Sequence, residues 1–341
     1  IEMLDYLESY NILYNYIGNK GSEVKTKTFT KKQGVVYKTH LSVVIFDEKF
    51  INLFKGLPKR IYPKVETLSP KDALELRSKV KALDSKGQPL LDKYGNQLYK
   101  KVKIEGVVRG ARPYRKDINT INNFLARKEI RTKYGVSLSV FYYRLFGETL
   151  KDYGRFYSSF SNLPKELRRS LLFNGESVVE KDYFSNHAMI LYTLEGIKVK
   201  DDFEPYTTGN AKEILKDFNT VDHRSIYKIA LLACVSAKTK KGLSVSVYNG
   251  LTSAGFDIEG GLTKLIVDDL ANHNQKIAHY FGSDMSAKLQ KIDSDIACEV
   301  MLSLIPYDKA FMCYHDSFIS PLSLESALVG VMELSWKKIL G

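Results

Sequence analysis

Two short strand-like segments, far apart in the chain, each carry an aspartate where a strand is expected to end or turn. Residues 177–183 (SVVEKDY) have the β-branched composition of a strand that ends at Asp182. Residues 311–320 (FMCYHDSFIS) divide into two short apolar strands around His315 and Asp316, which predicts a tight hairpin. A carboxylate at the tip of an otherwise buried strand costs free energy unless a charged group pairs with it.

If the fold brings these two carboxylates together, they repel one another unless cations lie between them. Magnesium bound to oxygen ligands removes the repulsion, and in-line phosphoryl displacement uses a pair of such ions. On this interpretation Asp182 and Asp316 hold two Mg²⁺ ions. One ion lowers the pKa of an attacking hydroxyl and the other stabilises the leaving pyrophosphate. In the alternative, Asp182 caps the following helix and Asp316 makes a turn. Either aspartate taken alone favours that alternative.

A helix expected over residues 224–237 (RSIYKIALLACVSA) carries two cations on one face, because Arg224 and Lys228 are four residues apart. The rest of this helix is nearly all apolar, as in a buried helix. Two cations along one stripe of such a helix suit a triphosphate. A solvent-facing edge on a core helix explains the pattern equally well.

The chain has 341 residues and a formal net charge of +12, and most of the excess lies between residues 101 and 174. That stretch contains 16 Lys and Arg against 6 Asp and Glu, with aromatic residues interleaved. Because cations neutralise phosphates and aromatic rings stack on bases, this composition suits a nucleic-acid channel. A solvated basic face above an ordinary aromatic core fits equally well. The candidate phosphate contacts are Arg109, Arg112, Arg115 and Lys116.

The remaining patterns predict helices and strands in a mixed order. Alternating residues in 34–46 predict strands, and two turn clusters in 84–96 predict a hairpin or loop excursion. Asp117 is an acceptable N-cap for a helix with one apolar face. That face consists of Ile118, Ile121, Phe124 and Leu125. Further helices are expected over residues 163–172, 187–194, 285–304 and 324–340, with a turn at Asn174 and Gly175.

Two classes of protein are disfavoured by simple counts. No run of 18 or more apolar residues occurs, so a transmembrane helix is not expected. The three cysteines are odd in number and lack the spacing of metal ligands. Cys234, Cys298 and Cys313 each lie among apolar residues, which predicts reduced, buried thiols in a cytosolic protein.

Five segments, taken in order, resemble those of the DNA polymerase I and single-subunit phage RNA polymerase superfamily, over roughly residues 150–341. The segments are a Gly-Arg segment (153–157), motif A with its preceding helix (163–196), motif B (224–237), a Gln-containing helix (289–301) and motif C (314–318). No single match is specific. Their shared order, each on the expected element, is what indicates the family.

The resemblance implies a role for each matched residue. Asp182 and Asp316 would be the ligands of two magnesium ions, and Arg224 and Lys228 would hold the incoming triphosphate. His315 would lie beside the growing 3′ end. Arg155 would contact the nucleic-acid hybrid, and Gln290 would lie near the primer terminus and template.

The implied fold class is α+β, a right-hand polymerase with a small antiparallel palm sheet and mostly helical fingers and thumb-like regions. The polymerase core would span residues 111–341, with the palm at about 150–200 and 286–341 and the fingers at about 200–285. Residues 1–110 would form an N-terminal accessory region whose function nothing identifies. The palm sheet would hold the motif A strand against the motif C hairpin.

Two positions depart from the family pattern, and both would read the sugar of the nucleotide. Five residues after the motif A aspartate, DNA polymerases of this family usually have Glu and phage RNA polymerases a small residue, whereas this chain has His187. Eight residues after the motif B lysine, both groups usually have Tyr, whereas this chain has Ser236. Loss of the Tyr removes one obstacle to a ribose, and a Ser can donate to a hydroxyl.

The preferred function is therefore a compact phage-type DNA-dependent RNA polymerase, and a DNA polymerase or primase of the same family is the runner-up. Its expected partners are a nucleic-acid template and product strand, nucleoside triphosphates, and an accessory or single-stranded DNA-binding protein, with no membrane. Its expected location is the cytoplasm of a bacterial or phage-infected cell. A catalytically decayed nucleic-acid-binding protein and an unrelated basic adaptor remain open alternatives.

Overall fold

The computed structural model covers the whole chain. It describes residues 13–16, 43–46, 73–85, 87–91, 97–104, 106, 108–133, 137–158, 160, 163, 165–200, 202–216 and 223–341. Most of the expected accessory region therefore lies outside the described residues, and so does most of the segment 34–46. Within that segment, strand β2 (Val43–Phe46) pairs antiparallel with β1 (Leu13–Tyr16). The division at residue 110 stays a prediction.

A five-stranded antiparallel sheet contains both segments that carry the predicted aspartates, residues 177–183 and 311–320. Its order is β10 (Met312–Tyr314), β11 (Ser317–Pro321), β9 (Glu176–Asp182), β8 (Leu171–Phe173) and β5 (Ile130–Thr132). Strands β8 and β9 are joined by Asn174 and Gly175, whose φ angles are 50° and 83°. Positive φ at both positions is what a two-residue hairpin loop requires. The expected strands, turn and hairpin are thus confirmed.

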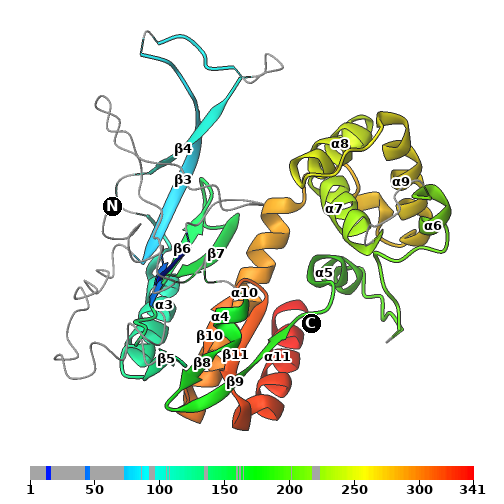
Figure 1. Cartoon of the computed structure of the whole chain (residues 1–341). Coiled ribbons are helices and arrows are strands. Elements are labelled where there is room, and N and C mark those ends of the chain that lie inside the picture. The colour runs from blue at the N-terminus through cyan, green and yellow to red at the C-terminus, as the bar shows by residue number, and fades with distance from the viewer. Residues whose placement is uncertain are drawn as a thin grey trace.

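A second sheet lies beside the first and has the order β4 (Tyr99–Lys103), β3 (Leu74–Lys81), β6 (Tyr142–Phe146) and β7 (Tyr153–Ser158). Only β3 and β6 are parallel; the other pairs are antiparallel. Strands β3 and β4 extend beyond their neighbours as a two-stranded ribbon that projects from the body of the molecule (Figure 1). Bridges Leu83↔Pro89 and Leu91↔Gln97 continue this ribbon, which confirms the excursion expected at 84–96.

Helix α10 (Ser286–Leu304) is a long helix that joins the second sheet to neighbouring helices. It packs against β7, α3 (Arg112–Leu125), α5 (Asn186–Leu194) and α11 (Glu325–Leu340). One stripe of α10 is fully buried, at the spacing of a helix face turned to a core. The stripe includes Leu289, Ile296, Val300 and Leu304. Because β7 and α5 both rest on α10, this helix fixes the position of one relative to the other.

The segment expected to be mostly helical, residues 200–285, forms a separate helical cluster in its described part (Figure 1). Its helices are α6 (Ala211–Ile214), α7 (His223–Ser236), α8 (Leu243–Ser253) and α9 (Gly260–His273). Short 3₁₀ turns are η1 (Lys240–Gly242), η2 (Ala278–Tyr280), η3 (Ile305–Tyr307) and η4 (Leu322–Leu324). Helix α7 packs on α8 and α9 through its apolar residues, so the expected motif B helix exists as a core helix.

Two expected helices differ in extent from the structure. The helix expected to start near Asp117 begins at Arg112, because Pro113 fits the first turn, where no N–H is needed. Its apolar face is buried as expected. The helix expected over 163–172 is only α4 (Lys165–Arg169). Leu171–Phe173 form strand β8 instead, because pairing with β5 and β9 outweighs local helix propensity.

The structure confirms the α+β class, while the right-hand arrangement stays a prediction. All three cysteines are buried free thiols, as expected. Among the described residues, no helix combines the length and apolar character that crossing a bilayer requires.

Candidate functional site

The register of the five-stranded sheet brings the two predicted aspartates side by side. Asp182 at the end of β9 is the Cα partner of Ser317, the residue after Asp316. The N–H of Tyr183 donates to the carbonyl oxygen of Asp316 at 3.3 Å. His315 and Asp316 form the turn between β10 and β11, with His315 at a φ of 59°. The main chains of Asp182 and Asp316 are therefore neighbours at one edge of the sheet.

Both carboxylates lack a countercharge in direct contact. No ion pair or hydrogen bond joins Asp182 or Asp316 to another side chain of the described residues. Asp182 is exposed and Asp316 is half-buried. Burial raises the pKa of Asp316 above its ordinary value, and the nearby charge of Asp293 raises it further. Carboxylates without a charged partner, carried on neighbouring main chains, are candidate ligands for a cation.

Magnesium fits this donor set. It is bound in proteins through one or two carboxylates together with waters and substrate phosphates, rather than by a full cage of protein ligands. The described residues contain no group of three or more His, Cys, Asp or Glu side chains placed to hold a metal. Asp182 and Asp316 would thus be ligands for magnesium only together with water or a bound phosphate.

A third acid, Asp293, lies beside this pair and was not predicted from the sequence. It is on α10 and only 3% exposed. The Nη2 of Arg155 donates to its Oδ2 at 3.2 Å, and the Nδ2 of Asn186 donates to its Oδ1 at 2.7 Å. Burial alone would raise the pKa of Asp293, but His187 and Arg155 outweigh that effect and hold it below its usual value. Asp293 is therefore an ionised, buried anchor for side chains from β7 and α5.

The sequence does contain a signal for Asp293. Counted back from Ile296 and Val300, position 293 falls in the buried stripe of α10, where an acid is out of place. An acid in an apolar stripe indicates a buried partner. It does not indicate which partner, and the neighbours became known only from the packing of α10 on β7 and α5.

The structure brings Arg155 and His187 together. The Nη2 of Arg155 lies 3.4 Å from the Nε2 of His187, and that Nε2 lies 3.9 Å from the Oδ2 of Asp293. Arg155 follows Gly154, which has a φ of 78° and whose backbone lies against Phe146. A Cβ at this position would come within 2.6 Å of the Phe146 ring, so a side chain there is excluded. The close packing of Gly154 against Phe146 therefore fixes the position of the neighbouring Arg155 on β7.

His315 lies at the tip of the hairpin between β10 and β11 as expected, half-buried against aromatic rings. Its ring is edge-on to that of Tyr157, with centroids 6.4 Å apart. Burial lowers the pKa of His315, and the charge of Arg155 lowers it further. Its Nδ1 is buried and has no hydrogen-bond partner among the described residues. A neutral imidazole with an unused nitrogen is suited to accept or donate one hydrogen bond to a ligand.

Arg224 on α7 is tied to the segment that follows β9. Its Nε donates to the Oε2 of Glu204 at 2.8 Å, and its Nη2 lies 3.4 Å from the Oγ of Ser185. The guanidinium also lies 5.9 Å from the ring centroid of Phe184, close behind Asp182 in the chain. Lys228, one turn along α7, is exposed and makes no ion pair with a described residue. Arg224 and Lys228 thus lie on one face of the helix, as expected, and Arg224 is already paired with Glu204.

The other predicted residues are not joined to this cluster. Gln290 is half-buried on α10 and donates to the Oγ of Ser286 at 3.3 Å. Ser236 is exposed near the end of α7. The cations Arg109, Arg112 and Lys116 are exposed near the start of α3, and Arg115 is half-buried with its Nε unpartnered among the described residues. No hydrogen bond or ion pair between described residues connects these side chains to Asp182, Asp316 or Asp293.

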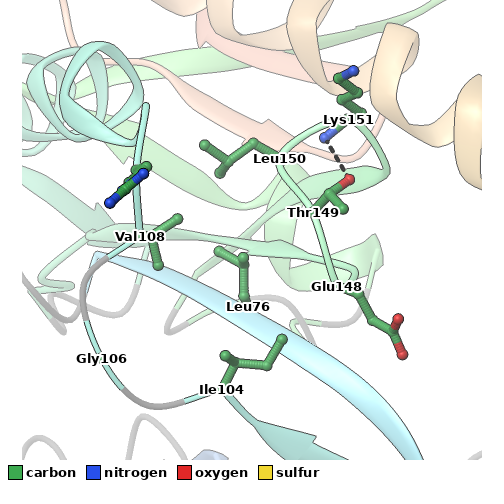
Figure 2. Close-up of a pocket in the computed structure, with 9 residues that line it drawn as sticks. Leu76, Ile104, Gly106, Val108, Glu148, Thr149, Leu150 and Lys151 are labelled. Carbon is green, nitrogen blue, oxygen red and sulfur yellow. Dashed lines mark hydrogen bonds between the residues drawn. The ribbon is translucent and has the colours of Figure 1, made fainter.

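Two surface hollows lie elsewhere. One, of about 460 Å³, is lined by residues of β3, of the segment between β4 and α3, and of the β6–β7 loop (Figure 2). The other, of about 790 Å³, is lined by residues that include Phe203, Glu204 and His273. Neither contains Asp182, Asp316 or Asp293. Only the second touches the cluster, through Glu204, the partner of Arg224.

Comparisons with known proteins do not assign this chain to a family. No protein-family model matches the chain, and no curated protein matches it. Among solved structures, the chain is similar to the POL domain of Pol1 from M. smegmatis, in complex with DNA primer-template and dNTP. The identity is 12% and the TM-score 0.35, over 68% of this chain and 49% of that one. The chain thus spans about half the length of that structure, and at this TM-score the likeness assigns neither a fold nor an activity.

Proposed function

We propose that the chain is a template-directed nucleotidyltransferase whose two magnesium ions are held by Asp182 and Asp316. The observation that supports this most is the pairing of β9 with β11, which makes the main chains of Asp182 and Asp316 neighbours while neither carboxylate has a charged partner among the described residues. A cationic helix is linked to the same edge through Arg224 and Ser185. Two carboxylates without a charged partner, next to a helix that carries Arg224 and Lys228, suit a metal–triphosphate complex.

In this proposal the protein contributes mainly positioning and electrostatics. Magnesium, when bound, supplies Lewis-acid chemistry that favours ionisation of the attacking 3′-hydroxyl and stabilises the pyrophosphate that leaves. Arg224 and Lys228 bind the triphosphate, and Arg224 exchanges the carboxylate of Glu204 for phosphate oxygens as it does so. His315, neutral and with Nδ1 unused, seats the 3′ end of the primer.

The choice between ribonucleotides and deoxyribonucleotides turns on His187 and Ser236. We infer a preference for ribonucleotides, as in a compact phage-type RNA polymerase, because Ser236 leaves open the position where a Tyr would crowd a ribose. His187 is held by Asp293 and Arg155, so it is a fixed imidazole that can hydrogen-bond a sugar hydroxyl. A DNA polymerase or primase is the runner-up, and a decayed nucleic-acid binder is the third candidate.

One assay separates these candidates. The protein is incubated with magnesium and single-stranded template, with and without a primer, and with either ribonucleotides or deoxyribonucleotides. RNA made without a primer supports the preferred function, and primer-dependent DNA supports the runner-up. No product under any condition, together with template binding, supports the decayed binder.

Three amide variants test the metal site. Asp182→Asn and Asp316→Asn should each abolish nucleotide addition, because an amide is a far weaker ligand for magnesium than a carboxylate. Asp268→Asn, an exposed acid on α9, is the matched control and should keep full activity. Circular dichroism should show all three folded. Full activity in Asp316→Asn would refute the proposal.

A further inference from the structure

The projecting ribbon of β3 and β4 has one face that is almost entirely cationic. Its register places Arg77 opposite Lys103, Lys79 opposite Lys101, and Lys81 opposite Tyr99. Residues directly opposite one another in an antiparallel pair share a face, and alternate pairs lie on opposite faces. These three pairs therefore share one face, and the pairs Ser78–Val102 and Val80–Lys100 share the other.

This arrangement is unfavourable for the free protein. Like charges directly opposite in a sheet destabilise the pair. Lys79, Lys81, Lys101 and Lys103 are all exposed, and none makes an ion pair with a described residue. Only Arg77 has a carboxylate partner, Glu75 on its own strand. A face that repels itself when free is stabilised by a polyanion that binds it.

The same face continues across the sheet towards β7. Strand β3 pairs with β6 so that Glu75 lies opposite Leu145, and β6 pairs with β7 so that Leu145 lies opposite Arg155. Tyr143 and Tyr157, two residues along, also lie opposite one another, with rings stacked at 5.8 Å.

One contact ties the ribbon to β7: the Nζ of Lys101 lies 5.8 Å from the ring centroid of Tyr153 at the start of β7. The charge of Arg77 also acts on Tyr143, because it opposes the rise that burial causes in the pKa of that tyrosine. The ribbon and the tyrosine pair are thus parts of one surface.

This surface ends at the hairpin of β10 and β11, which carries His315 and Asp316. The ring of Tyr157 contacts the ring of His315 edge-on, with an angle of 82° between their planes. His315 is the neighbour of Asp316 in the turn. A ligand that follows the cations and tyrosines from the ribbon is therefore led to the proposed metal site.

We propose that this face, formed by Arg77, Lys79, Lys81, Tyr99, Lys101, Lys103, Tyr143 and Tyr157, is a track for a single strand of nucleic acid. Cations along a backbone path bind phosphates, and exposed or half-exposed rings stack on unpaired bases. Interleaving of the two favours a single strand over a duplex, whose bases are already stacked. The direction of the track rests on the proposed function, whereas the binding itself does not.

The chain supplies a matched control for the cations. Lys100 lies on the same ribbon but on the opposite face, across from Val80. Binding of a labelled oligothymidylate is followed by fluorescence anisotropy over a series of salt concentrations. The double variant Lys79→Gln/Lys101→Gln should reduce the slope of log K against log salt by about 1.4, since each phosphate contact contributes about 0.7 for single strands. Lys100→Gln should leave the slope unchanged.

A second readout follows from the repulsion between Lys79 and Lys101. The double variant should melt at a higher temperature than the wild type while binding more weakly, a combination that misfolding does not give. An unchanged salt slope, or an equal loss in Lys100→Gln, overturns the track.

The role of the rings is tested separately with Tyr99, which is 58% exposed. Tyr99→Ala should weaken oligothymidylate binding about fivefold or more but leave binding of inorganic polyphosphate unchanged. Tyr307→Ala, 45% exposed and away from this face, should change neither. Tighter binding to a blunt duplex, or to phosphatidylserine vesicles, than to the single strand would overturn the assigned ligand.

The two proposals fail in different ways. Binding is measured without magnesium or nucleotides, so Asp316→Asn should bind the oligonucleotide as the wild type does. If Asp316→Asn keeps full nucleotide addition, the proposed reaction is wrong whatever the binding shows. If Asp316→Asn is inactive but the double variant binds normally, only the track is wrong.

Discussion

Asp293 is the buried acid on which three side chains of the candidate site converge. It accepts hydrogen bonds from Arg155 and Asn186, and the Nε2 of His187 lies 3.9 Å away. Because Arg155 and His187 come from β7 and α5, neither element alone fixes their relative position. We infer that Asp293 is a positioning residue, which on the proposed function would act on the sugar and the nucleic acid through these neighbours.

Asp293→Asn keeps the shape of the side chain and removes its charge. It should lower stability by about 1–3 kcal/mol, the cost of leaving buried hydrogen-bonding partners unsatisfied. It should also shift the ratio of ribonucleotide to deoxyribonucleotide incorporation, because His187 loses its anchor. The ratio of kcat/KM for the two nucleotide classes, with a urea unfolding curve, measures both effects.

The control for this variant lies two residues further along α10. Asp295 pairs with Arg144, which is 1% exposed, and with Lys291, but with none of the site residues. Asp295→Asn should lower stability and leave the incorporation ratio unchanged. If both variants alter the ratio equally, Asp293 has only a structural role.

Among single residues, the two aspartates at strand ends could be predicted from the sequence, whereas Asp293 and Glu204 could not. Asp182 and Asp316 lie at the ends of strand-like runs, so their placement could be inferred from pattern alone, and the pairing of β9 with β11 makes their main chains neighbours. Asp293 and Glu204 acquire meaning only from partners far away in the chain, Arg155 and Arg224. Pairings of this kind depend on how elements pack, which one sequence does not state.

Among the elements, β7 is fixed by a contact that excludes any side chain at Gly154. Gly154→Ala combines a φ of 78° with a Cβ 2.6 Å from the Phe146 ring. It should destabilise the fold by about 2 kcal/mol and weaken nucleotide addition, because Arg155 is displaced.

Gly330→Ala on α11 is the matched comparison, because nothing lies within 4 Å of its Cβ and its φ is not positive. That substitution should stabilise the protein by about 0.5–1 kcal/mol, since Ala loses less backbone entropy in a helix. Urea unfolding of both variants measures the change in the free energy of unfolding, which should be negative for Gly154→Ala and positive for Gly330→Ala. A neutral Gly154→Ala would show that β7 moves freely to accept the side chain.

The element-scale predictions succeeded where local pattern and tertiary pairing agree. Examples are the helix expected over residues 224–237, the hairpin around His315 and Asp316, and the Asn174–Gly175 turn. They failed at residues 171–173, where Leu-Leu-Phe continues a helical pattern but pairs as β8 between β5 and β9. The face shared by β3, β4, β6 and β7 was also beyond prediction, because the parallel pairing of β3 with β6 joins segments with no local signal.

For the whole molecule, the proposed metal site joins two parts of the chain that are distant in sequence. Strand β9 lies early in the described core and the β10–β11 hairpin near its end, and their pairing makes the main chains of Asp182 and Asp316 neighbours. Magnesium that binds both in the folded state, and neither in the unfolded state, must stabilise the fold by mass action. For a dissociation constant of about 1 mM, a tenfold excess of magnesium would add about 1.4 kcal/mol.

The melting temperature should therefore rise with magnesium in the wild type and in Asp268→Asn, and fall back when EDTA removes the metal. In Asp182→Asn and Asp316→Asn the rise should be lost, because each retains only one of the two carboxylates. This test needs neither substrate nor activity, so it separates a metal site from a catalytic defect. A magnesium response that persists in both variants would place the ion elsewhere and leave the two aspartates without the role that their adjacency suggests.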